Sequence, residues 1–315
     1  MDKWRFDGRI AIVTGAGGNP SLGRAHARLL AALGAQVVVN DIGRDPETPG
    51  YTGNASAESV AEEIRAAGGE AVADSHSVAS EEGAAAIVQT ALEAFGGIDV
   101  LINNAGISIA APFDEMTARD FRRHIDINLM GSLWTCRAVW SHMRSKGYGR
   151  IVNTTSGALS GVTWLAAYSA SKGGLLSLTR SLAAEGAALG IKVNAINPGA
   201  FTRMVAAQQE STSPMYQHAQ QNLPPELVSP VVAFLAHEKC PVSGECIDSV
   251  GGQVQRTYLA QTAGFTDPQL TIETVARRWQ EVVAGSAPSL IPAGAFDPTQ
   301  WDIKQYRPGP SRTKD

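Results

Sequence analysis

The feature of this sequence that most constrains its fold is a run of about thirty residues near the N-terminus. Residues 9–14 form a short apolar segment that leads into the glycine-rich turn of residues 15–18. A segment rich in alanine and leucine follows as far as Leu33, and a second apolar run, residues 37–41, ends in an acid. This order predicts a buried parallel strand, a turn, a helix and a second buried strand.

A strand, a glycine turn, a helix, a strand and an acid in this order are typical of a dinucleotide-binding unit. Glycines let the backbone approach a diphosphate, whose charge the N–H groups at a helix N-terminus bind. Asp41 would accept hydrogen bonds from the adenosine ribose and repel a 2′-phosphate, which favours NAD over NADP. Arg24 and Arg44 are nearby cations that weaken this preference. The alternative is an ordinary strand–helix turn with a surface acid.

Strands and helices continue to alternate along the chain to residue 252. Helices are expected at residues 55–67, 81–95, 116–143, 168–190 and 226–237, and strands at 71–75, 100–102, 150–155, 192–196 and 245–250. This pattern predicts an α/β domain, residues 1–252, with a single Rossmann-type doubly wound parallel sheet of about seven strands. Because parallel strands end at one edge, Gly15, Asp41, Asn104, Ser156 and Pro198 are expected to line one crevice.

Tyr168 and Lys172 stand four residues apart at the start of a predicted helix, which sets both side chains on one face. An ammonium close to a phenol favours the phenolate and lowers the pKa of the phenol from about 10. Such a phenol can exchange a proton near neutral pH. The spacing alone decides little, since a surface Tyr and Lys can share a helix face by chance.

Several short motifs occur in the order found in the short-chain dehydrogenase/reductases, which this chain resembles from about residue 6 to residue 252. They are Thr14-Gly15 with the glycine turn, Asn103-Asn104-Ala105-Gly106, Asn128, Ser156, Tyr168-x-x-x-Lys172 and Pro198-Gly199. A narrower resemblance is to the dehydrogenase unit of the peroxisomal multifunctional enzyme type 2 group, which includes 3-hydroxyacyl-CoA and 17β-hydroxysteroid dehydrogenases and bacterial stand-alone relatives. It rests on residues 38–43, Ser77-Val78, residues 148–151 and Thr202-Arg203-Met204.

The resemblance implies catalytic roles for four residues. Tyr168 would be the general acid/base, and Lys172 would bind the nicotinamide ribose and lower the pKa of the tyrosine. Ser156 would hydrogen-bond the reacting oxygen, and Asn128 would hold a water that links Lys172 to solvent. The implied cofactor-binding residues are Gly15, Gly17, Ser21, Leu22, Gly23, Asp41, Ser77, Val78, Asn104, Ala105, Gly106, Tyr168, Lys172, Pro198, Gly199, Phe201 and Thr202. No metal ligand is expected.

Two positions depart from the family's pattern. The turn of residues 14–23 is longer by about two residues, with Ser21 where a glycine is usual. The family commonly places its serine thirteen residues before the tyrosine, where this chain has Thr155. Counting from the preceding strand selects Ser156, which we prefer because a strand fixes a hydroxyl more tightly than a loop does. Alternatively, Asn128 could bend or cap a long helix, and Ser156 could be a plain capping serine.

The composition argues against several other classes of protein. The 315 residues are 44% apolar and 18% charged, and the net charge of −4 does not favour nucleic acid or an anionic membrane surface. The first residues lack an apolar signal segment, and no stretch approaches the length of a membrane span. Cys136, Cys240 and Cys246 lack paired or metal-ligand spacing, which is typical of reduced cytoplasmic thiols; a redox pair of Cys240 and Cys246 is the alternative.

The leading hypothesis is an NAD-dependent dehydrogenase that interconverts a secondary alcohol and a ketone by hydride transfer. A bulky hydrophobic substrate such as a 3-hydroxyacyl-CoA is expected, with a hydroxysteroid or terpenoid alcohol as the alternative, and a homodimer or homotetramer as the assembly. A hypothesis from another class is a dinucleotide-sensing protein that has lost catalysis. The presence of both Tyr168 and Lys172 disfavours it.

Residues 253–315 form a Pro-rich C-terminal extension with one amphipathic helix expected at residues 271–283. The extension carries five aromatic residues, Phe265, Trp279, Phe296, Trp301 and Tyr306. A disordered tail is normally depleted in aromatic residues. We therefore expect the extension to pack on its own domain or a partner subunit, near a substrate mouth formed by residues 201–223. The alternative is a helix that docks far from the site for stability alone.

Overall fold

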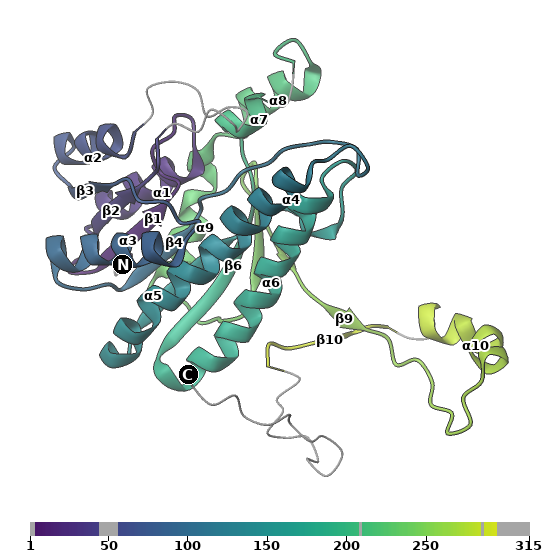
Figure 1. The fold of residues 1–315 in the computed structure, drawn as a ribbon. Helices are drawn as coiled ribbons and strands as arrows, with labels where there is room; N and C mark the ends of the chain where they lie inside the picture. The colour runs from purple at the N-terminus through teal and green to yellow at the C-terminus, as the bar shows by residue number, and fades with distance from the viewer. Residues whose placement is uncertain (1–3, 44–55, 208–209, 285–286, 295–315) are drawn as a thin grey trace. The chain divides into compact units, whose positions relative to one another are not determined.

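The computed structural model of this chain describes residues 4–43, 56–207, 210–284 and 287–294. The chain divides into two compact units, Met1–Thr257 and Tyr258–Asp315. In the first unit a central sheet carries helices on both of its faces (Figure 1). This arrangement confirms the predicted doubly wound α/β fold.

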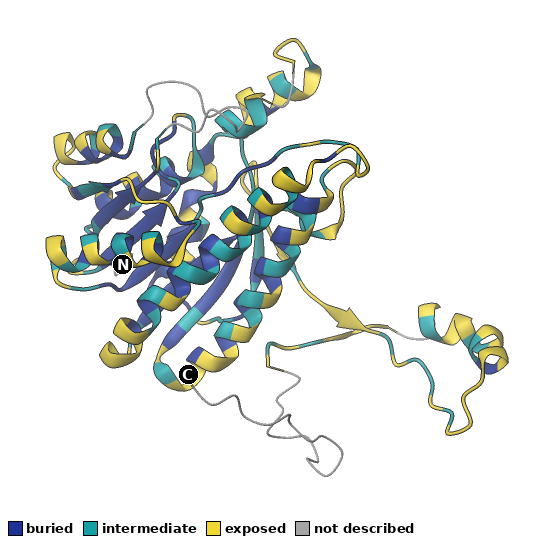
Figure 2. Ribbon diagram, in the orientation of Figure 1, coloured by how far each residue is buried: buried dark blue, intermediate teal, exposed yellow. Residues whose placement is uncertain are grey.

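The strands of the main sheet follow the order β3-β2-β1-β4-β5-β6-β7-β8. Their bounds are β1 Ile10–Thr14, β2 Gln36–Asn40, β3 Glu70–Asp74, β4 Val100–Asn103, β5 Gly149–Thr154, β6 Ile191–Gly199, β7 Cys246–Val250 and β8 Gln253–Thr257. From β3 to β7 neighbouring strands pair in parallel, and β8 runs antiparallel to β7. Every residue of β1, β4 and β5 is buried, as expected for strands covered on both faces (Figure 2).

The helices form one layer on each face of the sheet. Their bounds are α1 Leu22–Ala32, α2 Ala57–Ala66, α3 Glu81–Phe95, α4 Ala118–His124, α5 Gly131–Lys146, α6 Ala166–Gly186, α7 Arg203–Ala207, α8 Pro214–Asn222 and α9 Ser229–Ala236. One core cluster joins α1, α2 and α9 to the sheet, and a second joins α3, α5 and α6. Each buried Leu, Ile or Val side chain in these clusters contributes about 1.5–3 kcal/mol to folding.

The strand order reverses between β1 and β4, which pair with each other at the centre of the sheet. A reversal of this kind leaves a crevice outside the carboxyl ends of the two strands, where α/β proteins bind ligands. Thr14 ends β1, and its Oγ1 accepts hydrogen bonds from the backbone N–H groups of Asn104 and Ala105, both at 3.1 Å. The two strand ends are therefore held together at the base of this crevice.

The predicted helix at residues 116–143 is continuous in the structure but changes its winding. After α4, residues Ile125–Met130 form a π-helix, η1, before α5 begins. Single π-turns inside α-helices are frequent at functional sites. Asn128 lies in this segment and is fully buried.

The expectation that the sheet ends at residue 250 is wrong, because residues 253–257 add the antiparallel strand β8. Gly251 and Gly252 have φ angles of +55° and +85°, which a two-residue hairpin turn with two positive φ angles requires. The strand is almost entirely exposed, so it lacks the apolar pattern that marked the other strands. Since the first compact unit closes at Thr257, the extension begins after this residue instead of at residue 253.

The second unit contains the strands β9 (Ala260–Gln261) and β10 (Ser289–Leu290), which pair in antiparallel fashion, and helix α10 (Ile272–Ala284). The helix predicted at residues 271–283 is thus confirmed. Two of the five aromatic residues, Phe265 and Trp279, are described, and the Arg278 guanidinium lies 4.1 Å from the ring centre of Phe265. Phe296, Trp301 and Tyr306 lie outside the described residues.

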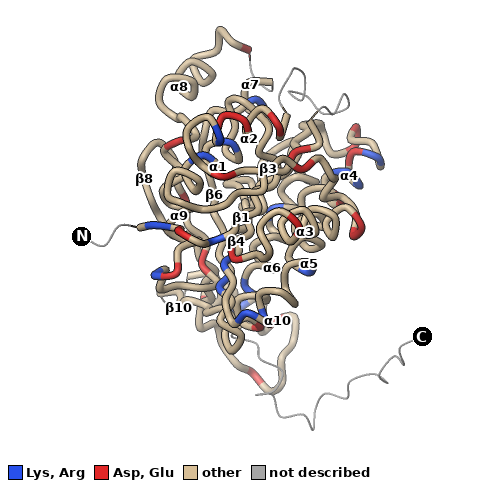
Figure 3. Tube along the Cα trace, turned by 90° about the vertical axis from the view of Figure 1, so that its left-hand side faces the viewer, with Lys and Arg blue, Asp and Glu red and all other residues tan. Residues whose placement is uncertain are grey.

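Basic and acidic residues are interspersed along the chain of the first unit, as the blue and red segments of Figure 3 show. A representative pair joins Arg24 of α1 to Glu63 of α2 at 2.7 Å. In the described part of the chain, no helix combines the length and the apolar character needed to cross a membrane.

Candidate active site

Two hollows at the carboxyl ends of the strands collect most of the predicted site residues. The larger, of about 220 Å³, and the smaller, of about 80 Å³, share Gly15 and Gly106 and so form one continuous crevice. The predicted residues that line the larger hollow are Gly15, Ser21, Leu22, Asn104, Gly106, Ser156, Tyr168, Lys172, Pro198, Gly199 and Thr202. Those that line the smaller one are Gly15, Asp41, Ser77, Val78, Ala105 and Gly106. Gly17, Gly23, Asn128 and Phe201 line neither hollow.

The glycine turn between β1 and α1 has room for its backbone but not for side chains. Gly15 has a φ of +65°, and a Cβ there would lie 2.7 Å from the Cα of Ala105. A Cβ at Gly23 would lie 2.6 Å from Nδ2 of Asn104. Ser21 caps α1 by accepting a hydrogen bond from the backbone N–H of Arg24 at 3.1 Å, and the first turn of α1 carries no acid. This helix N-terminus, which has no acid in its first turn, fits the diphosphate of a dinucleotide.

Asp41 directly follows β2 and is hydrogen-bonded to the glycine turn. Its carboxylate accepts hydrogen bonds from the backbone N–H groups of Gly17 at 2.9 Å and Gly43 at 2.8 Å. Burial raises the pKa of the Asp41 carboxyl, while the Gly43 and Gly17 amides and the nearby charge of Arg203 oppose that rise. Asp41 therefore shapes the turn as well as facing the smaller hollow.

Asn104 uses its side-chain amide to hold the same turn. Its Nδ2 donates to the backbone oxygens of Thr14 at 2.9 Å and Gly15 at 3.0 Å. The resemblance placed Asn104 beside the nicotinamide, and the residue does line the larger hollow. Its hydrogen bonds add a structural role, since they join the segment after β4 to the end of β1.

Ser156 and Thr155 both line the larger hollow with Tyr168, but of the two only the Ser156 hydroxyl acts on the pKa of the Tyr168 phenol, which it lowers. Ser156 Oγ accepts from the backbone N–H of Ala158 at 3.2 Å. The hydroxyl of Thr155 is buried and donates instead to the backbone oxygen of Ile196 at 2.9 Å. The two adjacent hydroxyls, which directly follow β5, therefore have different hydrogen-bond partners.

Lys172 lies one helical turn beyond Tyr168 on α6 and is 3% exposed. Its Nζ donates to the backbone oxygen of Thr154 at 2.7 Å and lies 5.6 Å from the centre of the Tyr168 ring. Burial lowers the pKa of Lys172 to about 8. The ammonium therefore loses its proton more readily than an exposed lysine.

The pKa of Tyr168 differs from the expectation that Lys172 lowers it. Burial of the hydroxyl raises this pKa above its ordinary value of 10.0, and the hydrogen bond with Ser156 opposes the rise without reversing it. The reason is desolvation, which penalises a buried phenolate strongly.

Asn128 is held by neighbouring residues on three sides. Its Oδ1 accepts from the backbone N–H of Ile107 at 2.8 Å, and its Nδ2 donates to the Ile107 oxygen at 3.0 Å and to Ser171 Oγ at 3.1 Å. Ser171 in turn donates to the backbone oxygen of Tyr168 at 2.7 Å. These contacts engage the whole side-chain amide, so Asn128 joins the segment after β4 to helix α6.

Sequence reasoning missed two residues beside this site, His124 and Arg203. His124 Nδ1 donates to the backbone oxygen of Asp120 at 2.8 Å, and its Nε2 accepts from the backbone N–H of Ile109 at 3.0 Å. Its ring lies edge-on to Tyr168 with 6.3 Å between the ring centres, and burial lowers its pKa. The signal for His124 was its position one turn before Asn128, and for Arg203 a cation just beyond the end of β6.

Phe201 is directed away from the crevice. Its backbone N–H donates to the oxygen of Leu223 at 2.7 Å, and its ring packs edge-on against Tyr216 with 5.1 Å between the centres. The side chain thus helps to fold residues 201–223.

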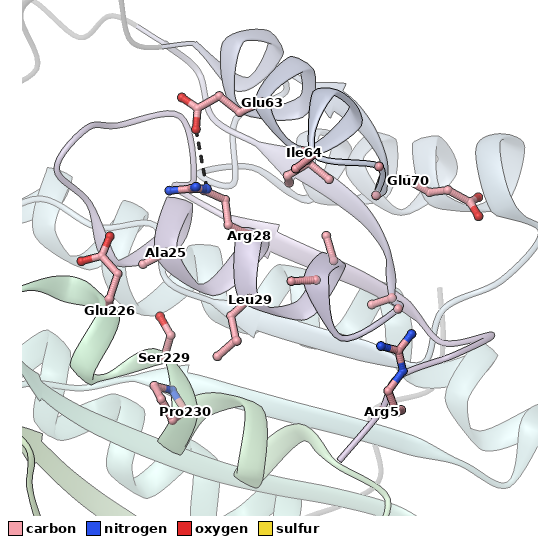
Figure 4. Close-up of a pocket in the computed structure, with 17 residues that line it drawn as sticks. Arg5, Ala25, Arg28, Leu29, Glu63, Ile64, Glu70, Glu226, Ser229 and Pro230 are labelled. Atoms are coloured by element: carbon pink, nitrogen blue, oxygen red, sulfur yellow. Dashed lines mark ion pairs between the residues drawn. The ribbon is translucent and has the colours of Figure 1, made fainter. Parts of the chain in front are cut away.

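A separate cavity of about 530 Å³ lies between α1, α2 and α9, and none of the predicted site residues lines it (Figure 4). Arg28 of α1 and Glu63 of α2 pair across its rim at 3.8 Å. Its volume exceeds that of the crevice, but the residues that line it include neither Tyr168 nor Lys172, the pair that the sequence singles out.

Comparisons with known proteins agree with this geometry. The model of the short chain dehydrogenase family matches residues 9–213. A short-chain type dehydrogenase/reductase of Mycobacterium tuberculosis is 41% identical over 276 residues, which cover 87% of this chain and 93% of the relative. The crystal structure of a short chain dehydrogenase from Mycobacterium avium aligns with a TM-score of 0.76 and 36% identity, covering 91% of this chain and 98% of that one.

The peroxisomal multifunctional enzyme type 2 of Drosophila melanogaster is also similar. It is 38% identical over 286 residues, which cover 89% of this chain and 46% of that protein. This chain therefore spans less than half the length of that multidomain relative.

Proposed function

Since this chain belongs to the short-chain dehydrogenase family, we propose that it is an NAD-dependent enzyme that interconverts a secondary alcohol and a ketone. The observation that carries the proposal is that Ser156, Tyr168 and the buried Lys172 line one hollow, with Lys172 Nζ 5.6 Å from the centre of the Tyr168 ring. When bound, the nicotinamide dinucleotide of this family supplies the hydride chemistry.

The residues of the chain then handle a proton and a developing charge. Tyr168 gives its phenolic proton to the carbonyl oxygen in reduction and takes it back from the alcohol in oxidation. Ser156 donates a hydrogen bond to the same oxygen and stabilises the negative charge that develops on it. Lys172 contributes a positive charge next to the tyrosine, which favours the phenolate that each turnover must form.

NAD is the proposed cofactor because of Asp41. Its carboxylate faces the smaller hollow, where the adenosine ribose would lie, and it would repel a 2′-phosphate. The hollow holds Val78, Ile107 and Ile127, whose apolar side chains suit an adenine ring.

The proposed substrate is a bulky hydrophobic alcohol such as a 3-hydroxyacyl-CoA. Trp164, four residues before Tyr168, is 63% exposed and has a φ of +66°, which strains a non-glycine residue. Its backbone oxygen accepts from the backbone N–H of Ala111 at 3.0 Å, and exposed Phe113 follows two residues after Ala111. Strain of this kind clusters at functional sites, and exposed apolar side chains suit a hydrophobic substrate.

A hydroxysteroid or terpenoid alcohol is the second candidate. Among the described residues that line the larger hollow, Lys172 and Arg203 are the only Lys or Arg. The phosphates of CoA would gain more from a basic cluster than from these two residues.

A turnover assay with purified full-length protein tests the proposal. We expect NADH to appear when NAD and a 3-hydroxyacyl-CoA, a hydroxysteroid or a terpenoid alcohol are supplied in turn, with the best kcat/KM for the acyl-CoA. The Tyr168→Phe variant is the matched control. Binding of NADH without turnover of any alcohol in this panel would support a dinucleotide sensor instead.

A further inference from the structure

Arg203 reaches from the start of α7 to the glycine turn. Its backbone N–H donates to the oxygen of Pro20 at 3.1 Å, which anchors α7 to the turn. A Cβ placed on Gly18 would lie 2.6 Å from Nε and 2.7 Å from Cζ of Arg203. The guanidinium therefore lies directly on Gly18, in space that any other residue at this position would occupy.

The position of this guanidinium places a cation beside the glycine turn. Its charge acts on the Asp41 carboxyl, whose neighbour Gly17 directly precedes Gly18. Lys172, the other cation lining the hollow, is bound to Thr154 at the catalytic end. Of the described residues that line the larger hollow, Arg203 alone thus supplies positive charge at the glycine turn.

We propose that Arg203 binds the diphosphate of the dinucleotide and thereby fastens α7 over the bound cofactor. This inference rests on the proposed function, because it needs a dinucleotide in the crevice. A guanidinium offers paired N–H donors that match phosphate oxygens, and the N-terminus of α1 supplies further donors from the opposite side. The diphosphate would thus be held between α1 and α7.

The diphosphate is favoured over a 2′-phosphate by the location of the contacts. Arg203 is anchored at Pro20 and packed on Gly18, both within the turn that leads to the N-terminus of α1. A 2′-phosphate would lie beside Asp41, whose carboxylate repels it. Gly18 is itself part of the proposed diphosphate site, because the absence of a side chain there lets the Arg203 guanidinium approach the backbone.

Binding of cofactor fragments to the full chain tests this role without relying on turnover. Calorimetric Kd values for adenosine, ADP-ribose, NADH and 2′-phospho-ADP-ribose are compared between wild type, Arg203→Gln and Arg203→Lys. We expect Arg203→Gln to weaken ADP-ribose and NADH about tenfold or more, to leave adenosine within twofold, and to flatten the salt dependence. Arg203→Lys should recover part of the loss, since it restores charge without the paired donors.

Arg24→Gln is the matched control, because it removes an equal charge near the turn from a side chain that pairs with Glu63. It should change the Kd of ADP-ribose less than threefold. Gly18→Ala provides a second route, since the added Cβ displaces the guanidinium. Its effect on ADP-ribose should largely disappear when Arg203→Gln is already present.

Three results would overturn the inference. They are an unchanged Kd for ADP-ribose in Arg203→Gln, an equal loss in Arg24→Gln, or a loss confined to the 2′-phosphorylated ligand. Wild-type protein that binds neither NADH nor ADP-ribose would instead refute the proposed function and this inference together.

Discussion

The Nζ of Lys172 donates to the backbone oxygen of Thr154 at 2.7 Å, which ties the first turns of α6 to the last residue of β5. The bond holds the ammonium at the carboxyl edge of the sheet, although burial there lowers its pKa to about 8. A charged group is thus kept where it costs stability and where the proposed chemistry needs it.

Replacing Lys172 with Met should stabilise the protein at pH 7 and abolish most activity. The folded pKa of about 8 lies below the ordinary value of 10.5, so the unfolded chain binds more protons between these values. Stability therefore rises with pH through this window, and the buried charge costs on the order of 3 kcal/mol below it. Urea unfolding should show Lys172→Met more stable by about 1–3 kcal/mol at pH 7, with the gap closing toward pH 10. A less stable variant at pH 7 would contradict this.

Tyr168→Phe and Ser156→Ala should lower kcat by about 10²–10⁴-fold and leave the Kd of NADH within a few-fold. The first change removes the ionisable group and keeps the ring, and the second removes the hydroxyl that lowers the pKa of the phenol. Thr155→Val is the control, since the hydroxyl of Thr155 is already engaged by the backbone oxygen of Ile196 in β6. Thr155→Val should lower the free energy of unfolding and leave kcat nearly unchanged. Near-normal turnover by the Tyr168→Phe variant would contradict the proposed mechanism.

Asp41 should set the choice of cofactor. Asp41→Asn keeps the shape of the side chain and removes the charge that repels a 2′-phosphate, so it should narrow the preference of kcat/KM for NAD over NADP about tenfold or more. Asp41→Ala should narrow it too, with an added loss for both cofactors because Gly17 and Gly43 lose their acceptor. Equal use of NAD and NADP by the wild type would show that the assignment of Asp41 is wrong.

His26 should make the fold sensitive to acid. It is fully enclosed between α1 and α9, where Nδ1 lies 2.8 Å from Ser229 Oγ, and burial lowers its pKa to about 3. Because the unfolded value is 6.5, the unfolded chain binds more protons between pH 6.5 and pH 3. The free energy of unfolding should fall through this window by an amount on the order of 5 kcal/mol. His26→Gln should flatten that slope, whereas Ser229→Ala, which keeps the imidazole, should not.

Truncation of the C-terminal extension tests the expectation that its aromatic residues line the substrate mouth or form a subunit interface. Truncation must follow Thr257 and not residue 252, because the earlier cut removes β8 from the sheet. Truncation after Thr257 should leave NADH binding intact while raising KM for large substrates or changing the oligomeric state, measured by light scattering. If KM and the oligomeric state both stay unchanged in a folded protein, the extension is neither a pocket wall nor an interface.

The sequence by itself determined the elements that depend on local patterns. Buried parallel strands such as β1 and β4 are apolar throughout, and Gly15 needs a positive φ that favours glycine. The four-residue spacing of Tyr168 and Lys172 already placed them on one helix face. These features were predictable because each is decided by residues close together in the chain.

The tertiary structure alone decided which partners each polar group meets. The Thr155 hydroxyl donates to Ile196, while Ser156 acts on the pKa of Tyr168. Arg203 lies on Gly18 although 185 positions separate them along the chain. The exposed strand β8 is held by its pairing with β7 and has no apolar pattern of its own. Likewise, burial from all sides, which no local pattern encodes, sets the pKa of Tyr168 and Lys172. Side-chain hydrogen bonds and desolvation depend on distant segments, so they appear only once the strands have been brought together.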